Sequence, residues 1–129
     1  MRTLASFIIL FFYASVSNSE ILDARVTNLG YGFQEVNATE TDGKFRYLYF
    51  GDRKLGKLGN YSISPSGNYA AFQDSPAGNL YLFRTADKTM EQLTKEFIAP
   101  ATKYSWNETL EIVDVKFSGK KETMSFAIE

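Results

Sequence analysis

Residues Tyr61–Thr94 read YSISPSGNYAAFQDSPAGNLYLFRTADKTMEQLT, and they give the clearest indication of the fold. They contain four short runs of apolar or alternating residues, separated by residues typical of turns. Pro65 fixes φ in the first turn, and Gly67 tolerates the positive φ that tight turns often need. Residues 74–78 form another turn. The predicted strands are 61–63, 69–73, 79–84 and 90–94. We therefore expect a four-stranded antiparallel meander.

The flanking sequence repeats this unit with a period of about 40 residues. Downstream, the segments 103–106, 110–114 and 123–128 parallel the first three strands. Upstream, the segments 31–34, 45–50 and 54–58 parallel the second, third and fourth strands. The fold class expected is all-β, with about three propeller-like four-stranded antiparallel units, the last without its fourth strand. Closed propellers use four to eight blades, so we expect an incomplete propeller or a stacked meander.

The count of units also suggests where the first strand of the domain pairs. The segment 21–27 belongs to no unit of its own, and it is predicted to supply the missing fourth strand of the last unit. That pairing would tie the two ends of the chain together. The alternative architecture is an unrelated meandering sandwich.

The segment Tyr61–Thr94 resembles one blade of the TolB-like β-propeller repeats. The residues that carry the resemblance are Ser64-Pro65-Ser66-Gly67, Tyr69–Phe72, Gly78–Leu82 and Gln92-Leu93-Thr94. Ser66 stands where the family usually has Asp. The resemblance is clear in this unit and weaker in the flanking units. It implies a propeller-type scaffold whose loops contact other proteins from one rim.

The first 19 residues have the order of a secretory signal peptide. A basic start at Arg2 is followed by the apolar run Leu4–Tyr13 and the small, polar segment Ala14–Ser19. The run is too short to cross a bilayer, which needs about 20 apolar residues. We expect one all-β domain over 20–129, periplasmic or secreted, with no membrane span after signal removal. The absence of cysteine suits a bacterial periplasm, whereas three Asn-x-Ser/Thr sequons at 37–39, 60–62 and 107–109 suit a eukaryotic secretory pathway.

The composition excludes several kinds of chemistry. The chain has no His and no Cys, which removes Ser-His-Asp triads, thiolate nucleophiles and the usual zinc sites. Its 14 basic residues are balanced by 15 acidic ones, which argues against nucleic acid as a partner. Asp42 and Asp52, on either side of 45–50, are the nearest approach to a carboxylate pair. We predict no catalytic, cofactor or metal residues, and no enzyme.

One insertion breaks the repeat, at residues 95–102 between the second and third units. Phe97 and Ile98 are large apolar residues in this linker, and we predict that they contact a protein partner. The alternative is that they fold inward and plug the open side of the stack.

The predicted function is a non-enzymatic protein-binding module, for example an inhibitor or immunity protein of a secreted hydrolase. Two alternatives stay open. One is a TolB-like accessory protein of envelope assembly. The other is a small carbohydrate-binding protein that uses the aromatic face of 45–50, where Phe45, Tyr47 and Tyr49 alternate with Arg46, Leu48 and Phe50.

Overall fold

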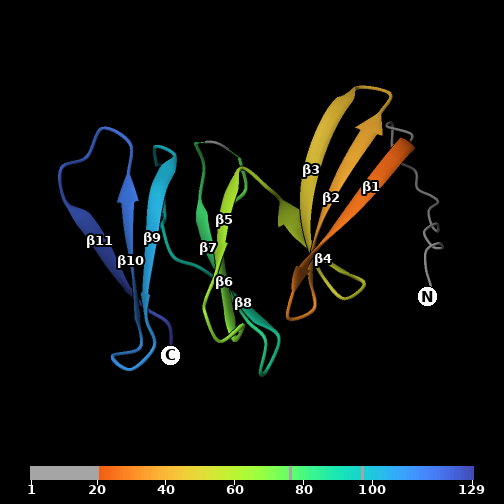
Figure 1. Cartoon of the computed structure of the whole chain (residues 1–129). Helices are drawn as coiled ribbons and strands as arrows, with labels where there is room; N and C mark the ends of the chain where they lie inside the picture. The colour runs from red at the N-terminus through yellow and green to blue at the C-terminus, as the bar shows by residue number, and fades with distance from the viewer. Residues whose placement is uncertain (1–20, 76, 97) are drawn as a thin grey trace.

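The computed structural model of the chain describes residues 21–75, 77–96 and 98–129. These residues form three antiparallel sheets that lie side by side, with the second sheet in the middle (Figure 1). The first sheet contains β1 (Ile21–Gly30), β2 (Phe33–Glu40), β3 (Gly43–Phe50) and β4 (Arg53–Lys57). The second contains β5 (Asn60–Ile63), β6 (Tyr69–Gln73), β7 (Leu80–Arg84) and β8 (Thr89–Gln92). The third contains β9 (Ala101–Asn107), β10 (Ile112–Phe117) and β11 (Thr123–Ala127).

The all-β class and the three propeller-like units of four, four and three strands are confirmed. In each sheet the spatial order follows the sequence, and none of the three sheets closes into a barrel. The strands of the second sheet lie within one or two residues of the predicted ranges, and β6 coincides with 69–73. In the third sheet β10 begins later than predicted. The turn before it extends through Glu111, whose φ is +60°, and the Asn107 side chain accepts the Leu110 N–H at 3.0 Å.

The segment 1–19, predicted to be a signal peptide, lies outside the described residues. The predicted pairing of 21–27 with the last unit is wrong. β1 pairs with β2 from Ile21 opposite Glu40 to Gly30 opposite Phe33, so it is the first strand of the first unit. The three residues 30–32 all have positive φ, which builds the tight turn of this hairpin. A hairpin between neighbouring strands closes a very short loop, and it costs much less chain entropy than pairing the two ends of the chain.

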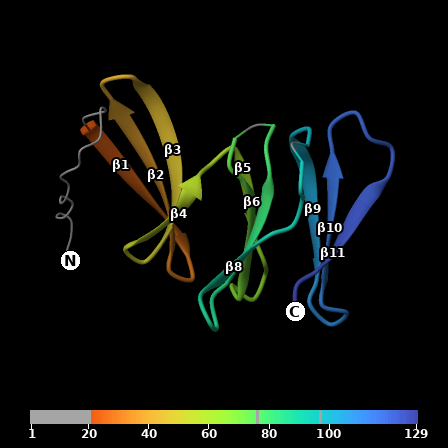
Figure 2. The same ribbon diagram turned by 180° about the vertical axis from the view of Figure 1, so that it is seen from behind.

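The second sheet lies between the other two (Figure 2). Two hydrophobic cores hold the sheets together, one on each side of it. β6 contributes to both, because Ala70 and Phe72 lie in the first core and Ala71 lies in the second. A strand buried on both faces is expected to be continuously apolar, as 69–72 is. The buried residues of the first core are Phe33, Leu48, Leu55, Leu58, Ala70, Phe72 and Phe83. Those of the second are Ala71, Leu80, Leu82, Val113, Val115, Phe117 and Ile128.

Turns at one rim join neighbouring sheets. The Tyr31 hydroxyl, in the β1–β2 turn, donates to the Pro65 carbonyl in the β5–β6 turn at 2.9 Å. Gly67 is required there, because its φ is +78° and a Cβ would lie 2.1 Å from the Tyr31 ring. On the other side of this turn, Ser66 donates its backbone N–H and its hydroxyl to the Glu108 carboxylate of the third sheet.

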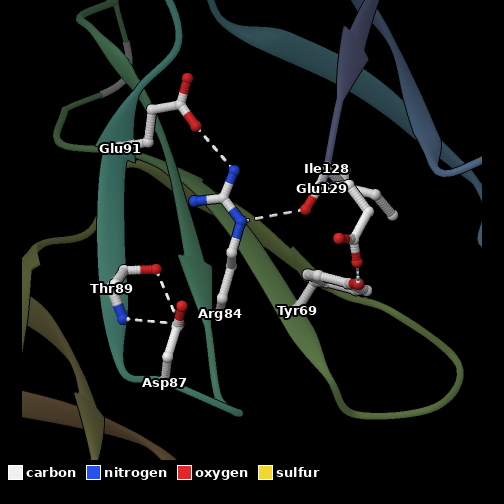
Figure 3. A network of polar contacts seen from close by, with 7 residues as sticks. All are labelled: Tyr69, Arg84, Asp87, Thr89, Glu91, Ile128 and Glu129. Carbon is white, nitrogen blue, oxygen red and sulfur yellow. Dashed lines mark hydrogen bonds and ion pairs between the residues drawn. The ribbon is translucent and has the colours of Figure 1, made fainter.

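The last two residues leave β11 and pack against the second sheet (Figure 3). Ile128 is fully buried in the second core, and its carbonyl accepts the Arg84 Nε–H at 3.0 Å. The same guanidinium forms an ion pair with Glu91 at 2.7 Å. The Tyr69 hydroxyl donates to the Glu129 carboxylate at 3.3 Å. These contacts anchor the third sheet to the second.

Candidate functional site

The linker between the second and third sheets holds the residues predicted to bind a partner. Phe97 lies outside the described residues. Ile98 is half-buried and packs against the second core, and its backbone pairs with Gly78 as an isolated bridge. For Ile98 the structure therefore shows packing between sheets, while contact of this linker with a partner stays a prediction.

Gln73 fixes the path of this linker, and sequence reasoning missed its role. Its side chain is fully buried, at the end of β6. The amide oxygen accepts hydrogen bonds from Asn60 at 2.6 Å and from the Ala101 N–H at 2.7 Å. The amide nitrogen donates to the carbonyls of Gly78 and Ala99 at 3.2 and 3.1 Å. A lone Gln that ends an otherwise apolar strand is the signal that could have found it, because a buried amide requires partners.

Two further hydrogen bonds join β5 to β9. The Tyr104 hydroxyl donates to the Asn60 side-chain oxygen, and the Trp106 indole N–H donates to the Ser62 hydroxyl at 2.9 Å. Burial raises the pKa of Tyr104 above its usual value of about 10, so this phenol keeps its proton into alkaline conditions. These groups are engaged within the fold and hold the sheets in register.

The described residues bring together no catalytic or metal-binding constellation. Asp42 and Asp52 lie in the turns at opposite ends of β3, which separates them by the length of an eight-residue strand. Such a strand spans roughly 25 Å, too far for a glycosidase pair. Within 21–75, 77–96 and 98–129 no three acidic side chains gather to hold a metal ion. The same ranges contain no helix long and apolar enough to cross a membrane.

A shallow depression of about 350 Å³ lies between the first and second sheets. It contains the Asp74 carboxylate, which accepts a hydrogen bond from the Tyr81 hydroxyl at 3.4 Å. Lys57 also lines it, but its ammonium lies 4.7 Å from the Phe45 ring centroid. The remaining lining residues are Leu55, Gly56, Phe72 and Met90. Among these described lining residues, none supplies a second carboxylate that could pair with Asp74 in acid–base chemistry.

The first sheet presents an apolar face on the side turned away from the second sheet. Leu48 and Phe50 of β3 point into the first core, so the alternate residues of β3 point the other way. The strand register places eight apolar residues of β1, β2 and β3 on that side. We call this set the apolar face, and it consists of Ile21, Ala24, Val26, Val36, Ala38, Phe45, Tyr47 and Tyr49. None of them belongs to either core.

Exposure varies across the apolar face. Ile21 and Val26 on β1 are 55% and 58% exposed, whereas Ala38 and Tyr47 are buried. The Lys54 ammonium lies 4.0 Å from the centroid of the Tyr47 ring, a cation–π contact that helps to cover it. The Tyr47 hydroxyl donates to Glu40 at 2.8 Å, and burial together with this hydrogen bond raises the pKa of Tyr47. The same side of the sheet also carries Asn28, Gln34 and Glu40, so this surface combines an apolar centre with polar residues and with lysines along its β4 margin.

The opposite end of the stack has a different character. The outward residues of the third sheet include Lys103, Ser105, Asp114, Lys116 and Ser125. Ser125 donates its hydroxyl to Asp114 within this surface. A polar face of this kind is expected where a sheet meets water. In the described part of the chain, the first sheet is therefore the one that turns an apolar face outward.

The fold and these surfaces define an open stack of three antiparallel sheets. Comparison of the chain with protein-family models, with curated proteins and with solved structures found no match.

Proposed function

We propose that this chain is a non-enzymatic protein-binding module, secreted or periplasmic, whose partner docks on the apolar face of the first sheet. The observation that carries the proposal is the pairing of an apolar centre with a cationic margin on an outward sheet face. Protein interfaces commonly combine an apolar centre with a polar rim. Lys54 and Lys57 favour a partner with carboxylates around its apolar contact.

The concrete form of this function is an inhibitor or immunity protein that covers a secreted hydrolase. The signal-like segment 1–19 supports that compartment, and the lack of His and Cys supports a role without catalysis of its own. A TolB-like accessory role in envelope assembly is the alternative with a protein partner. The identity of the captured partner distinguishes the two.

Carbohydrate binding receives less support from the geometry. Sugars stack on open aromatic rings, but lysine ammonium groups lie over Tyr47 and Phe45 at 4.0 and 4.7 Å from the ring centroids. Tyr47 is also 7% exposed, which leaves little of the ring for a ligand. We therefore favour a protein partner.

The test uses two adjacent, exposed positions of β1 that face opposite sides of the sheet. Val26→Lys places a charge in the apolar face, whereas Thr27→Lys places it on the other side, opposite Glu35. Immobilised wild type and Thr27→Lys should capture a common protein from an extract of the producing cells, and Val26→Lys should not. With that protein purified, calorimetry should show binding weakened at least ~10-fold by Val26→Lys only.

Two results contradict the proposal. One is equal binding of the purified protein by both variants. The other is binding to glycans on an array that Val26→Lys abolishes, which would establish the carbohydrate alternative.

The linker residues Phe97 and Ile98 are a second proposed contact. Phe97→Ala should weaken binding of the purified partner by at least ~10-fold without lowering the melting temperature if this linker docks. Unchanged binding would remove Phe97 from the interface.

A further inference from the structure

β11 forms an open edge at the position where the other two sheets have a fourth strand. In the part of the chain that the structure describes, β11 pairs with β10 on one side and with no strand on the other. Its sequence, TMSFA, has no charge and no proline, and its pairing with β10 has no register shift. Edge strands usually carry charges or irregularities that prevent further pairing. The corresponding edge strand β4 carries Arg53, Lys54 and Lys57.

The direction of the free backbone groups follows from one hydrogen bond. The Ile128 N–H donates to the Glu111 carbonyl of the preceding turn at 3.0 Å, one step beyond the pair Ile112–Ala127. In an antiparallel pair, alternate residues direct both backbone groups to the same side. Phe126 and Met124 therefore bond β10, while the N–H and C=O groups of Thr123, Ser125 and Ala127 point to the open side.

This edge is complementary to itself. If two copies pair antiparallel about a two-fold axis at Ser125, that residue lies opposite its own copy and Thr123 lies opposite Ala127. The outward backbone groups of these three residues then satisfy one another. Met124 lies opposite Phe126 on both sides of the axis, which gives a favourable sulfur–aromatic contact, and no charged residue of β11 opposes another.

The side chains support the same arrangement. Met124 is 42% exposed, although it lies next to Phe126, which packs at the margin of the second core. A strand added at this edge covers Met124 and extends the apolar side of the sheet. We infer that β11 is a self-association edge, through which two copies of this chain form one continuous six-stranded sheet. The proposed partner surface lies on the first sheet, at the other end of the stack, so the two proposals stand independently.

Two variants of one residue test the edge. Ser125→Pro and Ser125→Ala both remove the hydroxyl that bonds Asp114, but only proline removes the outward N–H. That N–H makes no bond to β10, and proline is tolerated on an edge strand where its nitrogen faces outward. The purified wild type and Ser125→Ala should sediment at twice the monomer mass as concentration rises, and Ser125→Pro should stay a monomer. Thr123→Pro, at the first position of β11, provides the same test should Ser125→Pro lower the melting temperature.

Cross-linking tests the register. The chain contains no cysteine, so any disulfide dimer of a single-cysteine variant joins the two introduced residues. Ser125→Cys should give a covalent dimer under mild oxidation, because the two-fold axis brings the two positions together. Ser105→Cys is the matched control, since Ser105 is exposed on the same face of the same sheet but lies on β9, at its other edge. A wild type that is monomeric at all concentrations, a folded proline variant that still dimerises, or equal cross-linking of both cysteine variants would each overturn the proposal.

Discussion

The two interfaces between neighbouring sheets are built from different interactions. Between the first and second sheets, aromatic rings meet at the centre: the Phe83 ring centroid lies 5.2 Å from that of Phe50 and 6.1 Å from that of Phe33. Hydrogen bonds join these sheets at the turns, such as the bond from Arg53 to the Lys88 carbonyl at 2.7 Å. The first interface therefore rests mainly on apolar burial.

Between the second and third sheets, the buried core is largely aliphatic. Polar side chains also form hydrogen bonds across this interface, at both of its ends and in the middle. Gln73 lies at one rim, Arg84 bonds the Ile128 carbonyl near the other, and Trp106 bonds Ser62 between them. Apolar burial is non-directional, whereas a hydrogen bond requires a donor and an acceptor in alignment. Apolar burial at the first interface therefore stabilises the packing of the two sheets. The hydrogen bonds at the second interface also fix the position of the third sheet relative to the second.

The largest loss of stability is expected from removing an aromatic ring at the interface between the first and second sheets. Phe83→Ala should lower the free energy of unfolding by about 3–5 kcal/mol, because Phe83 is fully buried between two other rings. Urea denaturation followed by circular dichroism measures this loss. Phe45→Ala is the control, since Phe45 is half-buried on the apolar face and should cost much less. Equal costs for the two changes would contradict the central role of the first core.

The next largest loss of stability is expected on removal of the buried Gln73 amide, whose hydrogen bonds join the second sheet to the linker. Gln73→Leu keeps most of the volume but leaves Asn60, the Ala101 N–H and two carbonyls without their partner. We expect a loss of about 2–3 kcal/mol of unfolding free energy, measured by urea denaturation. Gln92→Leu, at an exposed position of β8, should cost less than ~1 kcal/mol. A Gln73→Leu protein as stable as wild type would show that the amide does not position the linker.

A smaller effect is expected at the linker itself. Ile98→Ala should lower the unfolding free energy by about 1–2 kcal/mol, because the side chain is half-buried against the second core. Thermal unfolding measures the change, and Lys95→Ala at an exposed position of the same linker is the control. Unchanged stability combined with loss of partner binding would instead assign Ile98 to the partner interface.

The smallest effect is expected at Tyr104, and it depends on pH. Tyr104→Phe removes the hydrogen bond to Asn60 and should cost about 1 kcal/mol at neutral pH. Burial raises the pKa of Tyr104 in the folded chain above the unfolded value of about 10. The folded state therefore holds the proton more tightly, and this stabilising contribution is lost as pH rises above the unfolded pKa.

The two proteins should consequently become closer in stability under alkaline conditions. Urea midpoints at about pH 7 and pH 11 measure the difference between wild type and Tyr104→Phe. A difference that grows with pH would contradict the role assigned to the buried phenol.

Much of the fold could be predicted because its determinants are local. Pro65 and Gly67 specify the β5–β6 turn. The alternation in 45–50 predicts Leu48 and Phe50 on one side and the aromatic residues at 45, 47 and 49 on the other, as the strand register confirms. The absence of His and Cys excludes several mechanisms on composition alone.

The partner of β1 and the environment of Gln73 could not be predicted in the same way. The segment 21–27 was expected at the far end of the chain, but the three positive-φ residues from Gly30 to Gly32 return it onto β2. Gln73 is the polar last residue of an otherwise apolar strand, and a linker more than twenty residues later supplies two of its amide partners, the Ala99 carbonyl and the Ala101 N–H.

Local sequence patterns were enough to specify the four strands and turns of the second unit and the count of three units, because period-two alternation and turn residues act over a few neighbouring positions. They did not specify the unit to which β1 belongs. Tertiary packing alone settled which face of each sheet is covered. The second sheet is buried on both faces, the first turns an apolar face outward, and the third turns a polar one outward. Burial depends on which sheets stack and on how strand twist aligns them, and these contacts join residues far apart in the chain.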